Sequence, residues 1–287
     1  MPFPNPSRSL PAFKSVLLGL VIVGSRAFGG DGAPEPLDLS NFPGEIVEKV
    51  VVPIPAEIFA VLDKLGEPNW GSGIAPASER ELSSERAILA LTFGSTVGEG
   101  FIAVQARDSD EIQRIGKEVL SLSESLGLAS AVRPHSLAIV EAAGDRNWDR
   151  VREELDSTQQ TVRETMERLR DDELSGLVSL GGWLRGTHVV TCFIGESFSE
   201  DKAELLNQPG LVDHFQELLL SMSGPSKSSD VIRSLMAGLA RLEVIVSNVD
   251  RISEENVVEL REISQQMLEQ YYFDESSELG EGSGGVN

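Results

Sequence analysis

Three side chains with useful chemistry follow one another at intervals of four residues: His188, Cys192 and Glu196. In an α-helix this spacing places an imidazole, a thiol and a carboxylate on one face. The set lacks the paired His or Cys spacings typical of zinc sites, and an apolar run offers nothing that would activate a thiol. We therefore interpret Cys192 as a buried structural residue beside a hydrogen-bonded His188, and we predict no metal ion, cofactor or catalytic residue.

Two charged residues, Glu99 and Arg185, interrupt stretches that are otherwise apolar. An isolated buried charge is too costly to keep, so these two are expected to form an ion pair if their helices pack together. The alternative is a polar pocket for a small anionic or zwitterionic ligand, with Arg185 as the anchor and His188 and Glu99 beside it. Solvent exposure of Arg185 and His188 distinguishes the two hypotheses.

The elements that must position these residues are two glycine-rich apolar segments, Ile88–Gln105 and Leu177–Glu196. A glycine inside a helix costs about 1 kcal/mol relative to alanine, and close approach of another backbone can offset that cost. We expect the two segments to be helices that cross at the centre of the fold. The glycines expected at the crossing are Gly94, Gly98, Gly181, Gly182 and Gly186.

The remaining chain favours an all-α fold, a multi-helix bundle or helical array of about eight to nine helices, because apolar residues recur at helical spacing and no useful alternating run appears. The helical domain is predicted over residues 54–273. Ser78 or Ser83 is expected to cap the first glycine-rich helix, Pro134 to lie in the first turn of its helix, and residues 196–209 to form a polar connection. The expected helices cover residues 56–65, 79–106, 109–126, 130–142, 149–170, 172–196, 211–222, 231–249 and 254–272.

Two short signatures recur in the same order. Leu65-Gly-Glu-Pro-Asn-Trp70 resembles Ala143-Gly-Asp-Arg-Asn-Trp148, and Leu91-Thr-Phe-Gly-Ser-Thr-Val97 resembles Val178-Ser-Leu-Gly-Gly-Trp-Leu184. They favour an internal duplication with pseudo-repeats 54–127 and 129–223, followed by C-terminal helices over 228–272, although a chance similarity stays open. A duplication would relate the two glycine-rich helices by a pseudo-twofold axis. Trp70 and Trp148 would then plug the ends of helix pairs.

Both ends of the chain differ in composition from this domain. Residues 1–29 indicate a signal peptide, with Arg8 and Lys14 before the apolar run Val16–Val23, and residues 30–53 form a linker or extended segment. An uncleaved anchor is the alternative to cleavage. Residues 274–287 are acidic and rich in Gly and Ser, which is typical of a disordered tail. We expect a periplasmic or secreted protein with no membrane span after cleavage.

Charge narrows the classes of function. Removing the three positive charges of residues 1–29 from a formal net charge of −22 leaves about −25, which argues against nucleic-acid binding. No recurrent catalytic motif is present. We therefore predict a non-enzymatic exported protein with a structural role or an unknown protein partner or small ligand. The alternative is a small-molecule sensor or enzyme that uses the polar pocket at the helix crossing. The sequence leaves the oligomeric state open.

Overall fold

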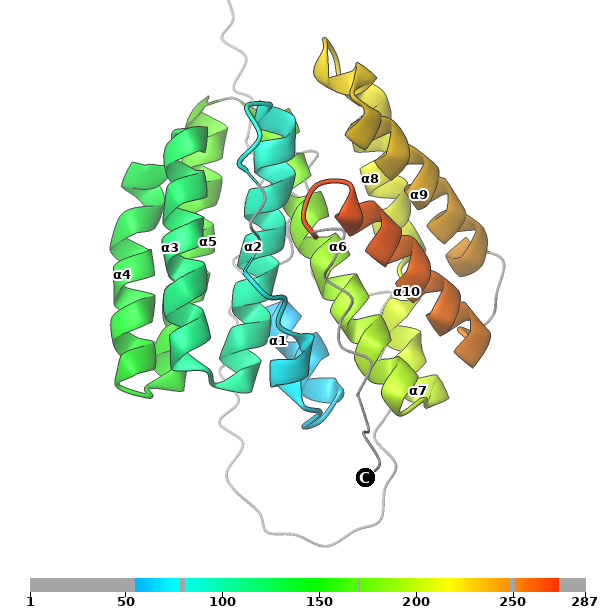
Figure 1. The fold of residues 1–287 in the computed structure, drawn as a ribbon, viewed down its shortest axis with the longest axis horizontal. Coiled ribbons are helices and arrows are strands. Elements are labelled where there is room, and N and C mark those ends of the chain that lie inside the picture. The colour runs from blue at the N-terminus through cyan, green and yellow to red at the C-terminus, as the bar shows by residue number, and fades with distance from the viewer. Residues whose placement is uncertain (1–54, 78–80, 170, 248–250, 274–287) are drawn as a thin grey trace, which may run out of the picture. The chain divides into compact units, whose positions relative to one another are not determined.

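The computed structural model describes residues 55–77, 81–169, 171–247 and 251–273, and their regular structure is entirely helical (Figure 1). The predicted all-α fold is confirmed, with nine helices of ten residues or more in the described part of the chain. The predicted signal peptide, linker and acidic tail lie outside the described residues. The helices are α1 (Pro55–Lys64), α2 (Arg86–Ala106), α3 (Ser109–Leu126), α4 (Ala129–Gly144), α5 (Trp148–Leu169), α6 (Asp172–Glu196), the short α7 (Glu200–Ala203), α8 (Pro209–Ser221), α9 (Asp230–Ser247) and α10 (Glu254–Glu269), with short 3₁₀ turns η2 (Trp70–Gly73), η3 (Glu204–Leu206) and η4 (Ser226–Ser228).

Capping side chains set several of the helix ends. The carboxylate of Asp108 accepts hydrogen bonds of 3.0 Å from the N–H groups of Asp110 and Glu111 at the start of α3. Asp171 caps α6 in the same way, through the N–H of Leu174 at 3.1 Å. Each cap satisfies backbone donors that have no partner within the helix. At the far end of α3, Gly127 adopts a φ of +78°, a left-handed conformation that suits glycine.

Three local predictions were wrong. The helix α2 begins at Arg86 rather than near residue 79, because the hydroxyl of Ser83 accepts from the N–H of Glu85 in a turn outside the helix instead of capping it. Pro134 lies inside α4, beyond its first turn. The expected polar connection over residues 196–209 contains α7 and η3, and their residues Ala203, Leu205 and Leu206 are buried in the core.

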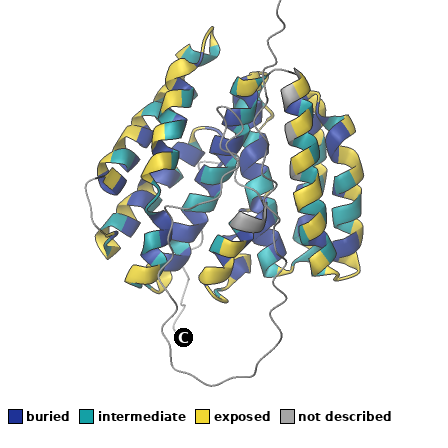
Figure 2. Cartoon of the chain, turned by 180° about the vertical axis from the view of Figure 1, so that it is seen from behind, coloured by how far each residue is buried: buried dark blue, intermediate teal, exposed yellow. Residues whose placement is uncertain are grey.

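Two long apolar helices, α2 and α6, lie side by side at the centre, and the other helices pack around them (Figure 1). The helices α3, α4 and α5 follow one another on the α2 side, whereas α10, α9 and α8 pack on the α6 side. Figure 2 shows that the outer helices turn exposed faces to solvent while α2 and α6 are mostly buried.

By length and composition, α2 and α6 are both able to cross a membrane. In their most apolar windows, 72% and 67% of the residues are buried within the described fold. The same composition is typical of the core helices of globular proteins, which are apolar on all sides.

Candidate functional site

The backbones of α2 and α6 meet at Gly94 and Gly181. A Cβ atom on Gly94 would overlap the carbonyl oxygen of Val178, and a Cβ atom on Gly181 would overlap the carbonyl oxygen of Leu91. Any larger residue at either position would therefore force two backbones apart. One helical turn away, a Cβ atom on Gly98 would lie 3.2 Å from the carbonyl oxygen of Gly182. Backbone contact is what offsets the cost of glycine in these helices.

The contact between the two helices is reciprocal. Gly94 meets Val178, and Gly181 meets Leu91. In the two similar sequence segments, Leu91 and Gly94 occupy the same positions as Val178 and Gly181. The crossing thus has the local twofold relation that a duplication would produce.

The segments that end at Trp70 and Trp148 resemble each other in sequence but differ in structure. Trp70 lies buried in η2 with its ring 5.0 Å from that of Phe193, whereas Trp148 is half-buried as the first residue of α5. Asn147 accepts a hydrogen bond of 3.2 Å from the N–H of Arg150, whereas the side chain of Asn69 makes no such cap. The duplication stays a prediction.

One face of the crossing holds the expected ion pair between Glu99 and Arg185, each only 1% exposed. Arg185 Nε donates to Glu99 Oε2 at 2.5 Å, and Nη2 donates to Glu99 Oε1 at 3.1 Å. The same two side chains hold the loop after η2, because Glu99 accepts from the N–H of Ala75 at 2.5 Å and Arg185 donates to the carbonyl oxygen of Gly73. The ion pair therefore makes its contacts within the protein and is closed off from solvent.

Two more side chains lie beside this ion pair, on the side of the crossing that we call the polar face because it holds Glu99 and Arg185. The Tyr272 hydroxyl lies 3.5 Å from Glu99 Oε2, and the Phe273 ring centroid lies 5.6 Å from Arg185 Cζ. Arg185 Nη1 is buried and has no hydrogen-bond partner among the described residues. The protein around this cluster excludes solvent.

The electrostatics of this face match a structural role. Burial alone would lower the pKa of Arg185, but the charge of Glu99 raises it above its ordinary value, so the guanidinium stays charged. Burial, reinforced by the charge of Arg185, lowers the pKa of His188 to about 3. Burial also raises the pKa of the Cys192 thiol. At neutral pH the imidazole and the thiol are both uncharged, and neither has a pKa suited to proton transfer.

The row His188, Cys192 and Glu196 does not form a metal site. His188 Nδ1 lies 3.3 Å from Ser264 Oγ, and Nε2 lies 3.8 Å from Cys192 Sγ, while Glu196 is exposed. No cluster of three metal-ligating side chains occurs among the described residues. Because His188 and Arg185 are both closed off from solvent, this geometry does not support the polar pocket that the sequence left open as an alternative.

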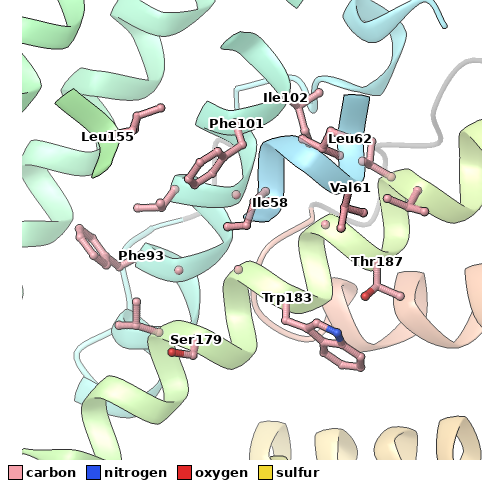
Figure 3. Close-up of a pocket in the computed structure, with 18 of the residues that line it drawn as sticks. Ile58, Val61, Leu62, Phe93, Phe101, Ile102, Leu155, Ser179, Trp183 and Thr187 are labelled. Atoms are coloured by element: carbon pink, nitrogen blue, oxygen red, sulfur yellow. The ribbon is translucent and has the colours of Figure 1, made fainter. Parts of the chain in front are cut away.

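A pocket does occur on the opposite face of the crossing (Figure 3). It has a volume of about 240 Å³ and is lined from α1 by Ile58 and Val61, from α2 by Phe101, and from α6 by Trp183, together with residues of α5, η3 and α8. The described lining is mainly apolar and contains no charged side chain. Its polar members are Thr158, Ser175, Ser179, Thr187 and Gln208.

Helical periodicity explains why the two faces are separate. On α2, Val97 and Phe101 face the pocket while Glu99 faces the ion pair. On α6, Gly186 lines the pocket, whereas the guanidinium of Arg185 is held in the ion pair with Glu99. Residues four apart share a face, whereas a step of one or two residues turns the side chain away.

Comparisons of this chain with known protein families, with curated proteins and with solved structures give no match. The function must therefore be argued from the chemistry of the pocket.

A further polar contact joins α4 to α5. His135 Nε2 lies 2.9 Å from Thr161 Oγ1, and Nδ1 lies 3.3 Å from Glu154 Oε2. A hydroxyl, an imidazole and a carboxylate follow one another in this order in catalytic triads. The Thr161 hydroxyl also donates to the carbonyl oxygen of Ser157 at 3.0 Å. Backbone N–H groups in the middle of a helix are already bonded, so no donors remain to stabilise an oxyanion. The contact ties the helices together. It could not be predicted from sequence, because its members come from two helices.

Proposed function

We propose that this protein is an exported, non-enzymatic protein that binds an apolar small molecule in the pocket formed by α1, α2, α5 and α6. The observation that carries the proposal is an open space of about 240 Å³ whose described lining is apolar and uncharged. Protein interiors have few voids larger than a water molecule, and an apolar cavity of about 150 Å³ is enough to bind benzene. The pocket is larger than packing defects normally are.

Gly186 gives independent support. Backbone contact accounts for Gly94 and Gly181, but a Cβ atom on Gly186 would meet nothing within 4 Å. In the middle of α6 this glycine costs about 1 kcal/mol relative to alanine without any packing reason. Since Gly186 lines the pocket, its missing side chain leaves the space open.

The other parts of the proposal come from the sequence and from the polar face. The apolar run Val16–Val23 after Arg8 and Lys14 favours export to the periplasm or the outside of the cell. A non-enzymatic role is favoured because Arg185 and His188 are buried and engaged in internal contacts.

The test uses diphenylhexatriene, an uncharged hydrocarbon that fluoresces in apolar surroundings. The full chain should bind it saturably, and Gly186→Leu should weaken binding at least about tenfold, because the new side chain fills the pocket and removes apolar contact area. Gly144→Leu is the matched control, since a Cβ atom at this other helical glycine also meets nothing within 4 Å but lies outside the pocket. Thermal unfolding should show that both variants fold. The absence of saturable binding to the wild-type chain, or equal binding by Gly186→Leu, would overturn the proposal.

A further inference from the structure

We infer that the pocket binds a single extended hydrocarbon chain whose polar end is uncharged and forms a hydrogen bond with the hydroxyl of Thr187. This inference rests on the proposed function and adds the class of ligand to it. Three features of the lining carry it: its length, its lack of charge and the hydroxyl of Thr187 in the middle of α6, which is unpartnered among the described residues.

The lining is long for its volume. On α6 it extends from Ser175 to Val190, which is about 22 Å at 1.5 Å per residue. On α5 it extends from Leu155 to Met166, about 16 Å by the same rise. A lipid chain spans about 15 Å, half of the hydrocarbon core of a bilayer. A volume of about 240 Å³ spread along such a length suits one extended chain better than a broad ring system.

The charge of the lining selects against an ionised head group. No described residue of the lining is charged, and the cation of Arg185 lies on the opposite face, where Glu99 neutralises it. A carboxylate or a phosphate would lose its water without gaining a counter-charge. The formal net charge of −22 adds a general repulsion of anions. An ammonium group would also lack a partner in the pocket, so the head group is uncharged.

Most polar side chains that line the pocket already form hydrogen bonds within the protein. The hydroxyl of Thr158 donates to the carbonyl oxygen of Glu154 at 2.6 Å, as threonine often does in a helix. Ser179 donates to the carbonyl oxygen of Ser175 at 3.1 Å. The indole N–H of Trp183 donates to Gln208 Oε1 at 2.9 Å, and the amide nitrogen of Gln208 donates to a backbone carbonyl. These groups hold the wall of the pocket in place.

Thr187 differs from them, because its hydroxyl makes no hydrogen bond with any described residue. Figure 3 shows its side chain projecting from α6 one turn beyond Trp183. The hydroxyl of Ser175 is also unpaired among the described residues, but it lies in the first turn of α6 beside Asp172 and Glu173, at the acidic end of the helix. Thr187 is half-buried, so its hydroxyl is reachable from the pocket and can bond to a ligand that supplies a partner. Thr187 is therefore the position for the head group.

The experiment measures displacement of diphenylhexatriene from the full chain by ligands with the same chain and different heads: hexadecanol, hexadecanoate and hexadecyltrimethylammonium. Hexadecanol should bind at least about tenfold more tightly than either ion, because an unpaired buried charge costs more than a neutral hydroxyl. Thr187→Val should weaken hexadecanol binding about fivefold relative to its effect on diphenylhexatriene binding, because only the alcohol loses one net hydrogen bond. Thr158→Val is the matched control, since its hydroxyl lines the same pocket but already bonds to its own helix.

The outcomes separate the two proposals. If diphenylhexatriene binds and Gly186→Leu blocks it, but hexadecanoate binds as tightly as hexadecanol, the pocket stands and the uncharged head group is wrong. Equal effects of Thr187→Val and Thr158→Val on hexadecanol would also overturn the role of Thr187. Failure of diphenylhexatriene to bind overturns the proposed function itself.

Discussion

The same two helices build a closed polar face and an open apolar face. On the first, Glu99 and Arg185 pair with each other and hold the loop at Gly73 and Ala75, and both side chains are buried. On the second, the side chains are uncharged and leave about 240 Å³ unfilled. The charged residues at this crossing therefore stabilise the fold, whereas the candidate binding site lies where apolar side chains leave a pocket.

The two faces differ because burying charged groups and burying apolar groups have different free-energy costs. A buried charge must be paired and hydrogen-bonded, so a polar core closes around its own partners. An apolar wall makes no such demand, because its contacts are weak and non-directional. A ligand can enter the apolar pocket without breaking an existing hydrogen bond. To enter the polar face it would have to displace the ion pair or the loop.

The largest expected effect is on the polar face. Arg185→Met should lower the free energy of unfolding by about 3–5 kcal/mol, since Glu99 would remain buried without its counter-charge. Denaturant unfolding would measure the change. Arg233→Met is the control, because its pair with Asp230 is exposed and should contribute less than about 1 kcal/mol. Similar losses in the two variants would mean that the buried pair has no special role.

The next effect compares the same substitution at two glycines. Gly94→Ala should lower the free energy of unfolding by about 3 kcal/mol, because its methyl group meets the backbone of Val178, which cannot rotate away. Gly186→Ala should raise it by about 1 kcal/mol, since alanine favours the helix and meets open space. Thermal and denaturant unfolding would test both. A loss of stability in Gly186→Ala would show that the glycine serves packing rather than the pocket.

The third comparison is a pH dependence from the polar face, which develops gradually as the solution is acidified. The pKa of His188 is about 3 in the folded chain against an ordinary value of 6.5, so below pH 6.5 the unfolded chain binds a proton that the folded chain does not. The contribution of this residue is therefore fully present above pH 6.5 and declines toward pH 3, by up to about 1.4 kcal/mol per pH unit. The difference in stability between the wild-type chain and His188→Gln should fall across that window. A difference that stays constant with pH would contradict the buried, neutral imidazole.

Much of the fold could be predicted from sequence because its signals are local or strongly constrained. The helical spacing of apolar residues gave the helices, and the predicted starts at residues 109 and 172 agree with α3 and α6, which Asp108 and Asp171 cap. The pairing of Glu99 with Arg185 followed from the cost of leaving either charge buried alone. The start of α2 was missed because Ser83 forms a local turn with Glu85, and a serine near a helix start looks the same in either role.

The pocket could not be predicted in this way. A pocket is the volume left over when the side chains of several elements pack together. The periodicity of apolar residues along the sequence contains no information about that volume. Ile58, Phe101 and Trp183 each look like ordinary core residues in their own segments. The prediction that Gly186 lies at the crossing was wrong, because a Cβ atom there would meet nothing within 4 Å. One signal was present in the sequence: Ser175, Ser179, Trp183 and Thr187 recur at intervals of four along α6.

The ion pair also joins distant parts of the chain. Glu99 precedes Arg185 by 86 residues, and Gly73 precedes it by 112. Closing loops of this length costs conformational entropy before the contact forms, and folds rich in such contacts fold slowly. A chain that ends before α6 therefore lacks the guanidinium that neutralises Glu99 in the folded domain.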